Sequence, residues 1–181
     1  MEKYFLAILP PEPISEKAEA IKLGLKEKFG VKYSLKSPAH ITLKMPFSYN
    51  EAKENLLVEK LKSFASGRNE FLLKIGTINT FGNRVVFLDV ESNEHLIQLQ
   101  TDLKHFCKRT LLLTDELSDR NFHPHMTLAF KDIKPSHFGE VLQFAKNHSF
   151  YSEFMVNDLV LLKRANGRWN VLQKISFSDS N

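Results

Sequence analysis

The chain has 181 residues, of which 43% are hydrophobic and 25% are charged, and it contains one cysteine, Cys107. This composition is sufficient for a buried core and excludes a largely disordered chain. A single cysteine excludes an intrachain disulfide framework, so a reducing, cytoplasmic setting is expected. The formal net charge of +4 suits a phosphate-bearing substrate but is too small to indicate nucleic-acid binding by itself.

The first half of the chain predicts the order strand, helix, strand, helix. Residues 4–9 form an almost continuous apolar run, typical of a buried strand. This run is too short for a signal peptide or a membrane span, so no membrane partner is expected. Apolar residues recur at helical spacing over residues 14–29, and Gly30 suits a helix C-terminus. A strand containing residues 40–43 follows, and a second helix fits after Asn50.

The second half repeats this order. Residues 84–90 predict a strand, and Ser92 or Asn93 can cap a helix that carries leucines on one face. A strand containing residues 125–128 follows, and then a helix after Pro135. The repeat predicts one domain over residues 1–181, made of two duplicated, intimately packed α/β lobes.

Two hairpins close the halves. Residues 71–81 lead through Gly82-Asn83 into residues 84–90. Residues 154–164 lead through a turn that contains Asn166-Gly167 into residues 169–177, and Asn-Gly strongly favours a tight reversal.

Each half contains a His-x-Thr tripeptide on a predicted strand. Because side chains alternate along a strand, His40 and Thr42 face one side while Ile41 faces the core. His125 and Thr127 repeat this pattern 85 residues later. Residues i and i+2 lie roughly 6.5 Å apart along a strand, so an imidazole and a hydroxyl can contact different oxygens of one phosphate.

These residue types suit phosphodiester cleavage without a metal. Histidine titrates near neutral pH, so one of the pair can take a proton from the nucleophile while the other delivers one to the leaving oxygen. The threonine hydroxyls would hold the non-bridging oxygens. The alternative is that both histidines are ordinary, hydrogen-bonded strand residues.

The segments HITL (residues 40–43) and HMTL (residues 125–128) resemble the two H-x-[T/S]-x signatures of the two-histidine (2H) phosphoesterase superfamily. The chain is similar in particular to its LigT-like, 2'-5' RNA ligase family. The similarity includes KYFLAILPP at the start and NFHPHMTLAF at residues 121–130, and it covers essentially the whole chain. It implies a pseudo-symmetric, bilobal α/β (α+β) fold, with two mainly antiparallel sheets around a central cleft and helices outside.

The resemblance also implies roles for individual residues. His40 and His125 match the catalytic pair, and Thr42 and Thr127 match the phosphate-binding hydroxyls. Members related to RNA ligases often continue the second motif as H-x-T-x-A-R. This chain has Phe130 at the arginine position, followed by Lys131, whose strand parity is opposite. The departure counts against an RNA ligase.

Five other residues are candidates for substrate binding: Lys44, Phe81, Arg84, His123 and Lys131. Lys44 shares the face of His40 and Thr42 by strand parity, so it is expected to stabilise phosphate charge, although surface lysines at strand ends are common. Phe81 could stack a nucleobase and Arg84 could pair with a phosphate, whereas simple packing is the plainer interpretation of Phe81.

His123 allows two interpretations. With His125 and His40 it could supply three nitrogen ligands to zinc, but no acidic residue or cysteine lies close in sequence. A supporting position beside His125 or at the cleft rim is therefore favoured. We expect no metal and no cofactor.

The sequence thus predicts a monomeric, metal-independent phosphoesterase that hydrolyses 2',3'-cyclic or similar cyclic phosphodiesters of nucleotides or RNA ends. Which histidine is the acid and which the base stays open. The alternatives are a 2'-5' RNA ligase and a non-catalytic protein that binds RNA or nucleotides in the same cleft.

Overall fold

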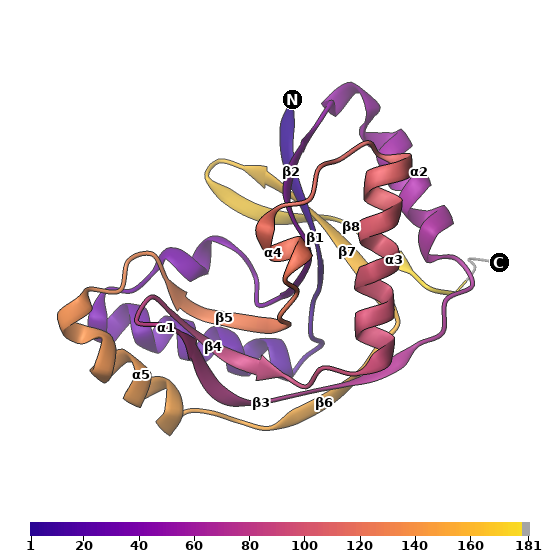
Figure 1. The fold of residues 1–181 in the computed structure, drawn as a ribbon. Coiled ribbons are helices and arrows are strands. Elements are labelled where there is room, and N and C mark those ends of the chain that lie inside the picture. Colours follow the sequence, from indigo (N-terminus) through magenta and orange to yellow (C-terminus); the bar gives the residue numbers. More distant parts are fainter. Residues whose placement is uncertain (179–181) are drawn as a thin grey trace.

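A curled, eight-stranded antiparallel sheet forms the frame of the protein in a computed structural model, which describes residues 1–178 (Figure 1). The strand order is β6-β3-β4-β5-β2-β1-β7-β8. The strands are β1 (Glu2–Ile8), β2 (Ile41–Tyr49), β3 (Phe71–Phe81), β4 (Val85–Val90), β5 (His125–Phe130), β6 (Ser152–Val156), β7 (Asp158–Ala165) and β8 (Arg168–Ser176).

Helices pack on one face of this sheet. They are α1 (Ile14–Phe29), α2 (Glu54–Ala65), α3 (Glu94–Thr110), the short α4 (Leu117–Arg120) and α5 (Phe138–Asn147), with 3-10 turns η1 (Tyr33–Lys36), η2 (Glu51–Lys53) and η3 (Pro135–His137). In the part of the chain that the structure describes, no helix has the length and apolar character needed to cross a bilayer.

The sheet consists of two four-stranded halves that meet at one residue pair. Strands β2, β1, β7 and β8 form the first half, and β5, β4, β3 and β6 form the second. The halves join where Ile41 of β2 pairs with Met126 of β5. The predicted α/β (α+β) class is confirmed, and the two expected sheets are the halves of this one continuous sheet.

Two of the helices, α1 and α3, pack against the half of the sheet that does not contain the preceding strand. Helix α1 follows β1 but packs against α5 and β5, in the second half, and α3 follows β4 but packs against β2, in the first. Helix α2 lies against β7 and β8. One continuous apolar core therefore fills the space between the sheet and its helices and joins both halves.

Strand β1 is buried on both faces, as its continuous apolar sequence predicts. Tyr4 and Leu6 belong to the main core beneath the sheet. Phe5 and Ala7 form a smaller apolar cluster with Val160 and Leu162 on the opposite, open face of the sheet. The partly buried Leu9 and Trp169 pack against this cluster. This second cluster becomes part of the candidate site.

Local signals set most element boundaries correctly. Gly30 ends α1 in a left-handed conformation, and its N–H donates to the carbonyls of Leu25 and Lys26. Asn93 caps α3 by accepting from the N–H of Leu96. Asn166 and Gly167 both have positive φ, 51° and 74°, which is the type I′ geometry of a tight hairpin.

The predicted strand over residues 154–164 is wrong, because the chain changes halves within it. Strand β6 pairs with β3 in the second half, whereas β7 pairs with β1 and β8 in the first. Between them, the carbonyl of Asn157 accepts from the N–H of Phe177 at 2.9 Å, outside the ladder of either half. A continuous apolar pattern carries no information about a change of strand partner.

Candidate active site

The two His-x-Thr motifs lie side by side at the junction of the halves. Because Ile41 pairs with Met126 in antiparallel register, His40 lies opposite Thr127 and Thr42 lies opposite His125. Ile41 and Met126 are fully buried, while the four polar residues are half-buried on the open face. The histidines are diagonal neighbours, for which the spacing is roughly 7–8 Å. The structure thus brings together the residues that the sequence pairs.

Both histidines are held by the same local hydrogen bond. Nδ1 of His40 lies 2.7 Å from the carbonyl oxygen of Pro38, and Nδ1 of His125 lies 2.7 Å from that of His123. A carbonyl only accepts, so Nδ1 carries the proton in each ring. Nε2 is therefore the nitrogen available to a ligand, and in the neutral ring it is a base.

Aromatic side chains pack against each imidazole. The ring centroid of Phe5 lies 4.9 Å from that of His40 and 4.8 Å from that of Trp169. In the other half, Phe81 and Phe87 lie 4.9 and 5.1 Å from the ring of His125. These contacts restrict the rotation of both imidazoles and lower the local polarity.

This environment favours the neutral form of both histidines. Burial lowers the pKa of His40 to about 4, although the hydrogen bond to Pro38 acts in the opposite direction, and the positive charges of Lys22 and His125 lower it further. Burial also lowers the pKa of His125, whereas the carboxylate of Asp89 raises it. Only His125 therefore has an acidic residue that favours its protonated form.

An ion pair between a buried lysine and a half-buried glutamate supports the loop that carries His40. The ammonium of Lys22 contacts a carboxylate oxygen of Glu19 at 2.9 Å and donates to the carbonyls of Ser34 and Ser37. The same Glu19 oxygen accepts from the N–H of Ala39 at 2.6 Å. Helix α1 thus fixes the backbone immediately before His40, which sequence reasoning did not find.

Lys44 does not face the site, contrary to the expectation from strand parity. Ala7 pairs with Thr42 but Leu6 pairs with Lys44, so β2 has one extra residue at this point, and β5 has a register shift at the equivalent place. Such a bulge turns Leu43 and Lys44 to the core side together. Lys44 is only 1% exposed and is unavailable to a phosphate on the open face.

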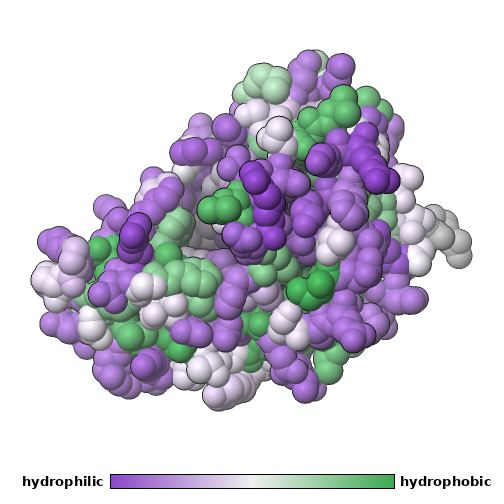
Figure 2. All heavy atoms as spheres, in the orientation of Figure 1, coloured by the Kyte–Doolittle hydropathy of each residue, from purple (hydrophilic) through white to green (hydrophobic). Residues whose placement is uncertain are grey.

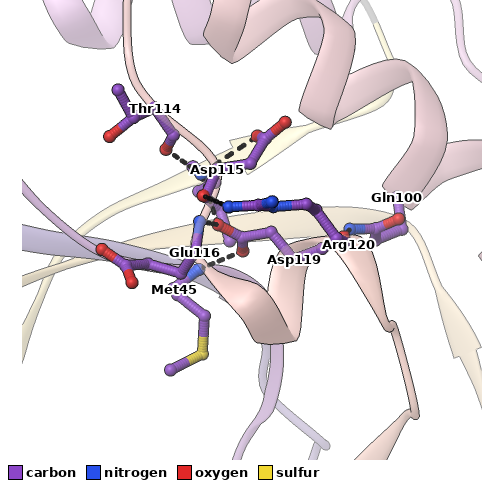
Figure 3. Close-up of polar contacts among 8 residues, drawn as sticks. Met45, Gln100, Thr114, Asp115, Glu116, Asp119 and Arg120 are labelled. Carbon is purple, nitrogen blue, oxygen red and sulfur yellow. Dashed lines mark hydrogen bonds and ion pairs between the residues drawn. The ribbon is translucent and has the colours of Figure 1, made fainter.

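The ammonium of Lys44 is instead held by the segment that leads to the second motif, of which Figure 3 shows Thr114, Asp115 and Asp119. It contacts the carboxylate of Asp119 at 2.5 Å and donates to the carbonyl of Thr114 at 2.8 Å. Asp119 also accepts from the backbone N–H groups of Met45 and Glu116. The two motif strands are thereby tied together beneath the site.

The remaining candidates lie at the margins. Phe81 packs against His125, as described above, and is 39% exposed. The exposed His123 lies with Nε2 3.6 Å from Asp89. Arg84 is exposed in the β3–β4 turn. Lys131 follows β5 with a positive φ of 66°, and its ammonium donates to the hydroxyl of Tyr33 at 3.1 Å.

Sequence reasoning missed several residues near the histidines: Phe5, Phe87 and Asp89 beside the rings, and Glu19 and Lys22 behind them. Strand parity could have placed Phe87 and Asp89 on the open face of β4. No sequence signal points to Glu19 and Lys22. Within residues 1–178, no three potential metal ligands converge.

Comparison with known proteins agrees with this fold. Residues 10–168 match the model of the 2'-5' RNA ligase superfamily, so the chain belongs to that superfamily, and the resemblance to 2H phosphoesterases of the LigT type is confirmed.

Individual relatives are similar over nearly their whole length. A protein of Bacillus cytotoxicus named "Putative phosphoesterase" is 31% identical over 173 residues, 93% of each chain. A relative of the same description from Bacillus mycoides is 28% identical over 182 residues, 99% of each chain.

Two solved structures share the fold. TT0787 of Thermus thermophilus has a TM-score of 0.70 at 19% identity and 97% coverage of both chains, and apo LigT of E. coli has 0.63 at 20% identity and 98% coverage.

Proposed function

We propose that the protein is a metal-independent phosphoesterase that hydrolyses 2',3'-cyclic or similar cyclic phosphodiesters of nucleotides or RNA ends. One observation carries the proposal: two imidazoles on neighbouring strands offer Nε2 to the same open face, each fixed through Nδ1. Each histidine has the threonine of the other motif opposite it. The names of the Bacillus relatives support a phosphoesterase, and solved structures of E. coli LigT with 3'-AMP, ATP and NADP+ support a nucleotide as ligand.

The chemistry requires two proton transfers. A neutral histidine takes a proton from water as the water oxygen bonds to phosphorus, while the protonated histidine gives its proton to the ribose oxygen as the ring P–O bond breaks. The hydroxyls of Thr42 and Thr127 donate to the non-bridging oxygens, on which negative charge accumulates. The product is an open phosphomonoester, and the protons exchange with solvent before the next cycle.

We assign the base to His40 and the acid to His125. His40 is packed against Phe5 and held next to the positive charge of Lys22, which favours the neutral form. His125 has Asp89 opposite it on β4, and that carboxylate favours the protonated form. Binding of an anionic phosphate would favour it further.

A second candidate is 2'-5' RNA ligation, which the name of the matching superfamily favours. The same pair of histidines would serve this reaction, in which a ribose hydroxyl of a second RNA strand replaces water, bonds to the phosphorus of the cyclic phosphate, and the ring P–O bond breaks. Phe130, at the position where ligase-like members often have arginine, counts against it. Incubation with RNA halves and analysis of the linkage would separate the two activities.

The test is a hydrolysis panel in the presence of EDTA. It offers the four 2',3'-cyclic nucleotides, ADP-ribose cyclic phosphate and a 2'-5' dinucleotide to the wild type, His40→Ala and His125→Ala. His105→Ala, at an exposed position of α3, is the matched control. We expect turnover by the wild type and the control only. Binding of cyclic nucleotides without any turnover would instead indicate a non-catalytic protein, and loss of turnover with EDTA would contradict a metal-independent mechanism.

A further inference from the structure

Four exposed cations surround one tyrosine beside the candidate active site. The ammonium groups of Lys36 and Lys131 each lie 4.5 Å from the ring centroid of Tyr33. Lys131 donates to the hydroxyl of this tyrosine, and Arg168 donates to the carbonyl of Leu35 on the same turn. With Arg164, these residues are called the basic platform: Tyr33, Lys36, Lys131, Arg164 and Arg168.

Three separate parts of the chain build the basic platform. Tyr33 and Lys36 belong to η1, Lys131 follows β5, and the two arginines flank the tip of the β7–β8 hairpin. Figure 1 shows the hairpin tip and the end of β5 on the same side of the molecule. The ring of Phe130 packs edge-on against Tyr33 at 5.0 Å, and Asp132 accepts from the N–H groups of Lys32 and Tyr33.

The cations of the basic platform outnumber the acidic residues beside them. The carboxylate of Asp132 accepts from the backbone at Tyr33, but no carboxylate of residues 1–178 forms an ion pair with any of the four cations. The hydrogen bond and the charge of Lys131, with the charges of Lys36 and Arg164, lower the pKa of Tyr33. Several like charges on one exposed surface raise the local positive potential, which favours the binding of an anion.

The basic platform adjoins the histidines on the side of His40. Arg168 precedes Trp169, whose ring packs on Phe5 and through it on His40. The hydroxyl of Ser34, in η1, donates to the carbonyl of Leu128, directly after Thr127. Thr127 and Lys131 are four residues apart in the chain, and four residues span at most roughly 13–14 Å. In the orientation of Figure 1 the surface is hollowed near β5, and hydrophilic side chains dominate the face around it (Figure 2).

The opposite side of the site has the opposite charge. Next to His125, a cavity of about 520 Å³ is lined by Asp89, Glu91 and Glu153, with Lys74 as its one cation among the lining residues. A polyanion that places its terminal phosphate at the histidines is therefore repelled from this side and attracted to the basic platform.

We propose that the basic platform binds the phosphates of single-stranded RNA on the 5' side of a terminal cyclic phosphate. The inference rests on the proposed function, because a 2',3'-cyclic phosphate ends an RNA strand and leaves only its 5' direction free. The site then acts on RNA ends in preference to mononucleotides. Backbone contacts of this kind are independent of base sequence and weaken with salt.

The test compares a platform variant, Lys36→Gln/Lys131→Gln/Arg168→Gln, with a control that removes the same charge elsewhere. Lys62→Gln/Lys108→Gln/Arg109→Gln serves as the control, because these exposed residues lie on α2 and α3, on the other face of the sheet. Binding of a fluorescein-labelled, single-stranded RNA with a 3'-phosphate is followed by anisotropy over a range of salt. Hydrolysis is measured for the same RNA ending in a cyclic phosphate and for 2',3'-cyclic AMP.

We expect the platform variant to bind the RNA at least about tenfold more weakly at low salt, with a salt slope reduced by about 2, since each single-strand phosphate contact contributes about 0.7. Its kcat/KM for 2',3'-cyclic AMP should stay within about twofold of the wild-type value. Its kcat/KM for the RNA should fall by about the same factor as its affinity for the RNA. The control should match the wild type.

Equal RNA binding by the platform variant and the wild type would overturn the inference, as would an equal loss of activity on both substrates. If the wild type hydrolyses neither substrate, the proposed function fails. In that case the anisotropy measurement still shows whether the basic platform binds RNA, because binding requires no turnover.

Discussion

Replacing Asp119 by asparagine should destabilise the protein strongly, although it removes only a charge. The carboxylate and the ammonium of Lys44 are each about 1% exposed, so neither is solvated by water. Breaking a buried pair leaves one uncompensated charge and typically costs about 3–5 kcal/mol. Asp115 at 3.5 Å and the carbonyl of Thr114 at 2.8 Å still contact the ammonium, which points to the lower end, about 3 kcal/mol.

The effect should reach the candidate site, because this pair joins the strand of the first motif to the segment before the second. Leu57→Ala, on the buried face of α2, serves for comparison, because it should lower the free energy of unfolding by a similar amount, about 2–5 kcal/mol. Leu57 is not part of the connection between the two motif segments. At a temperature where both variants are folded, Asp119→Asn should lower kcat more than Leu57→Ala does.

Urea unfolding followed by circular dichroism measures the free energies, and a double-mutant cycle with Lys44→Met isolates the pair. The double variant should be more stable than Asp119→Asn, because no unpaired charge remains buried. A loss below about 1 kcal/mol for Asp119→Asn would refute the reasoning, since surface pairs have that magnitude.

Four further outcomes are expected. The kcat/KM profile should be bell-shaped with its optimum below pH 7: activity appears as His40 loses its proton above a pKa of about 4, and disappears as His125, whose pKa is also lowered, loses its own. Lys22→Met should move the acidic limb of this profile to higher pH, because removing a positive charge raises the pKa of His40. Lys26→Met, at an exposed position of α1, is the control. An acidic limb that does not move would contradict the assignment of His40 as the base. Thr42→Val and Thr127→Val should each lower kcat about 10²–10³-fold with unchanged unfolding midpoints, and a change in KM alone would speak against hydroxyls that act in the transition state. Asn93→Ala should cost about 1 kcal/mol in urea unfolding through the lost cap of α3, and no change would contradict the cap.

The local sequence determined the elements and the spacing of the two motifs. Alternating burial of His40 to Leu43, the left-handed end of α1 at Gly30 and the Asn166-Gly167 turn all follow from interactions between residues close in the chain. The same short-range rules predicted a repeat of architecture and the face on which each histidine lies.

Only the tertiary structure decided which strands become neighbours. The antiparallel pair of Ile41 and Met126 sets each histidine opposite the other motif's threonine, and no local pattern encodes a pairing across 85 residues. The bulge that turns Lys44 toward Asp119 broke the parity rule for the same reason: alternation holds only while a strand keeps its register, and register is fixed by the partner strand. The contacts of Lys22 and Glu19 behind His40, and the meeting of three segments at Tyr33, likewise depend on packing between distant parts of the chain.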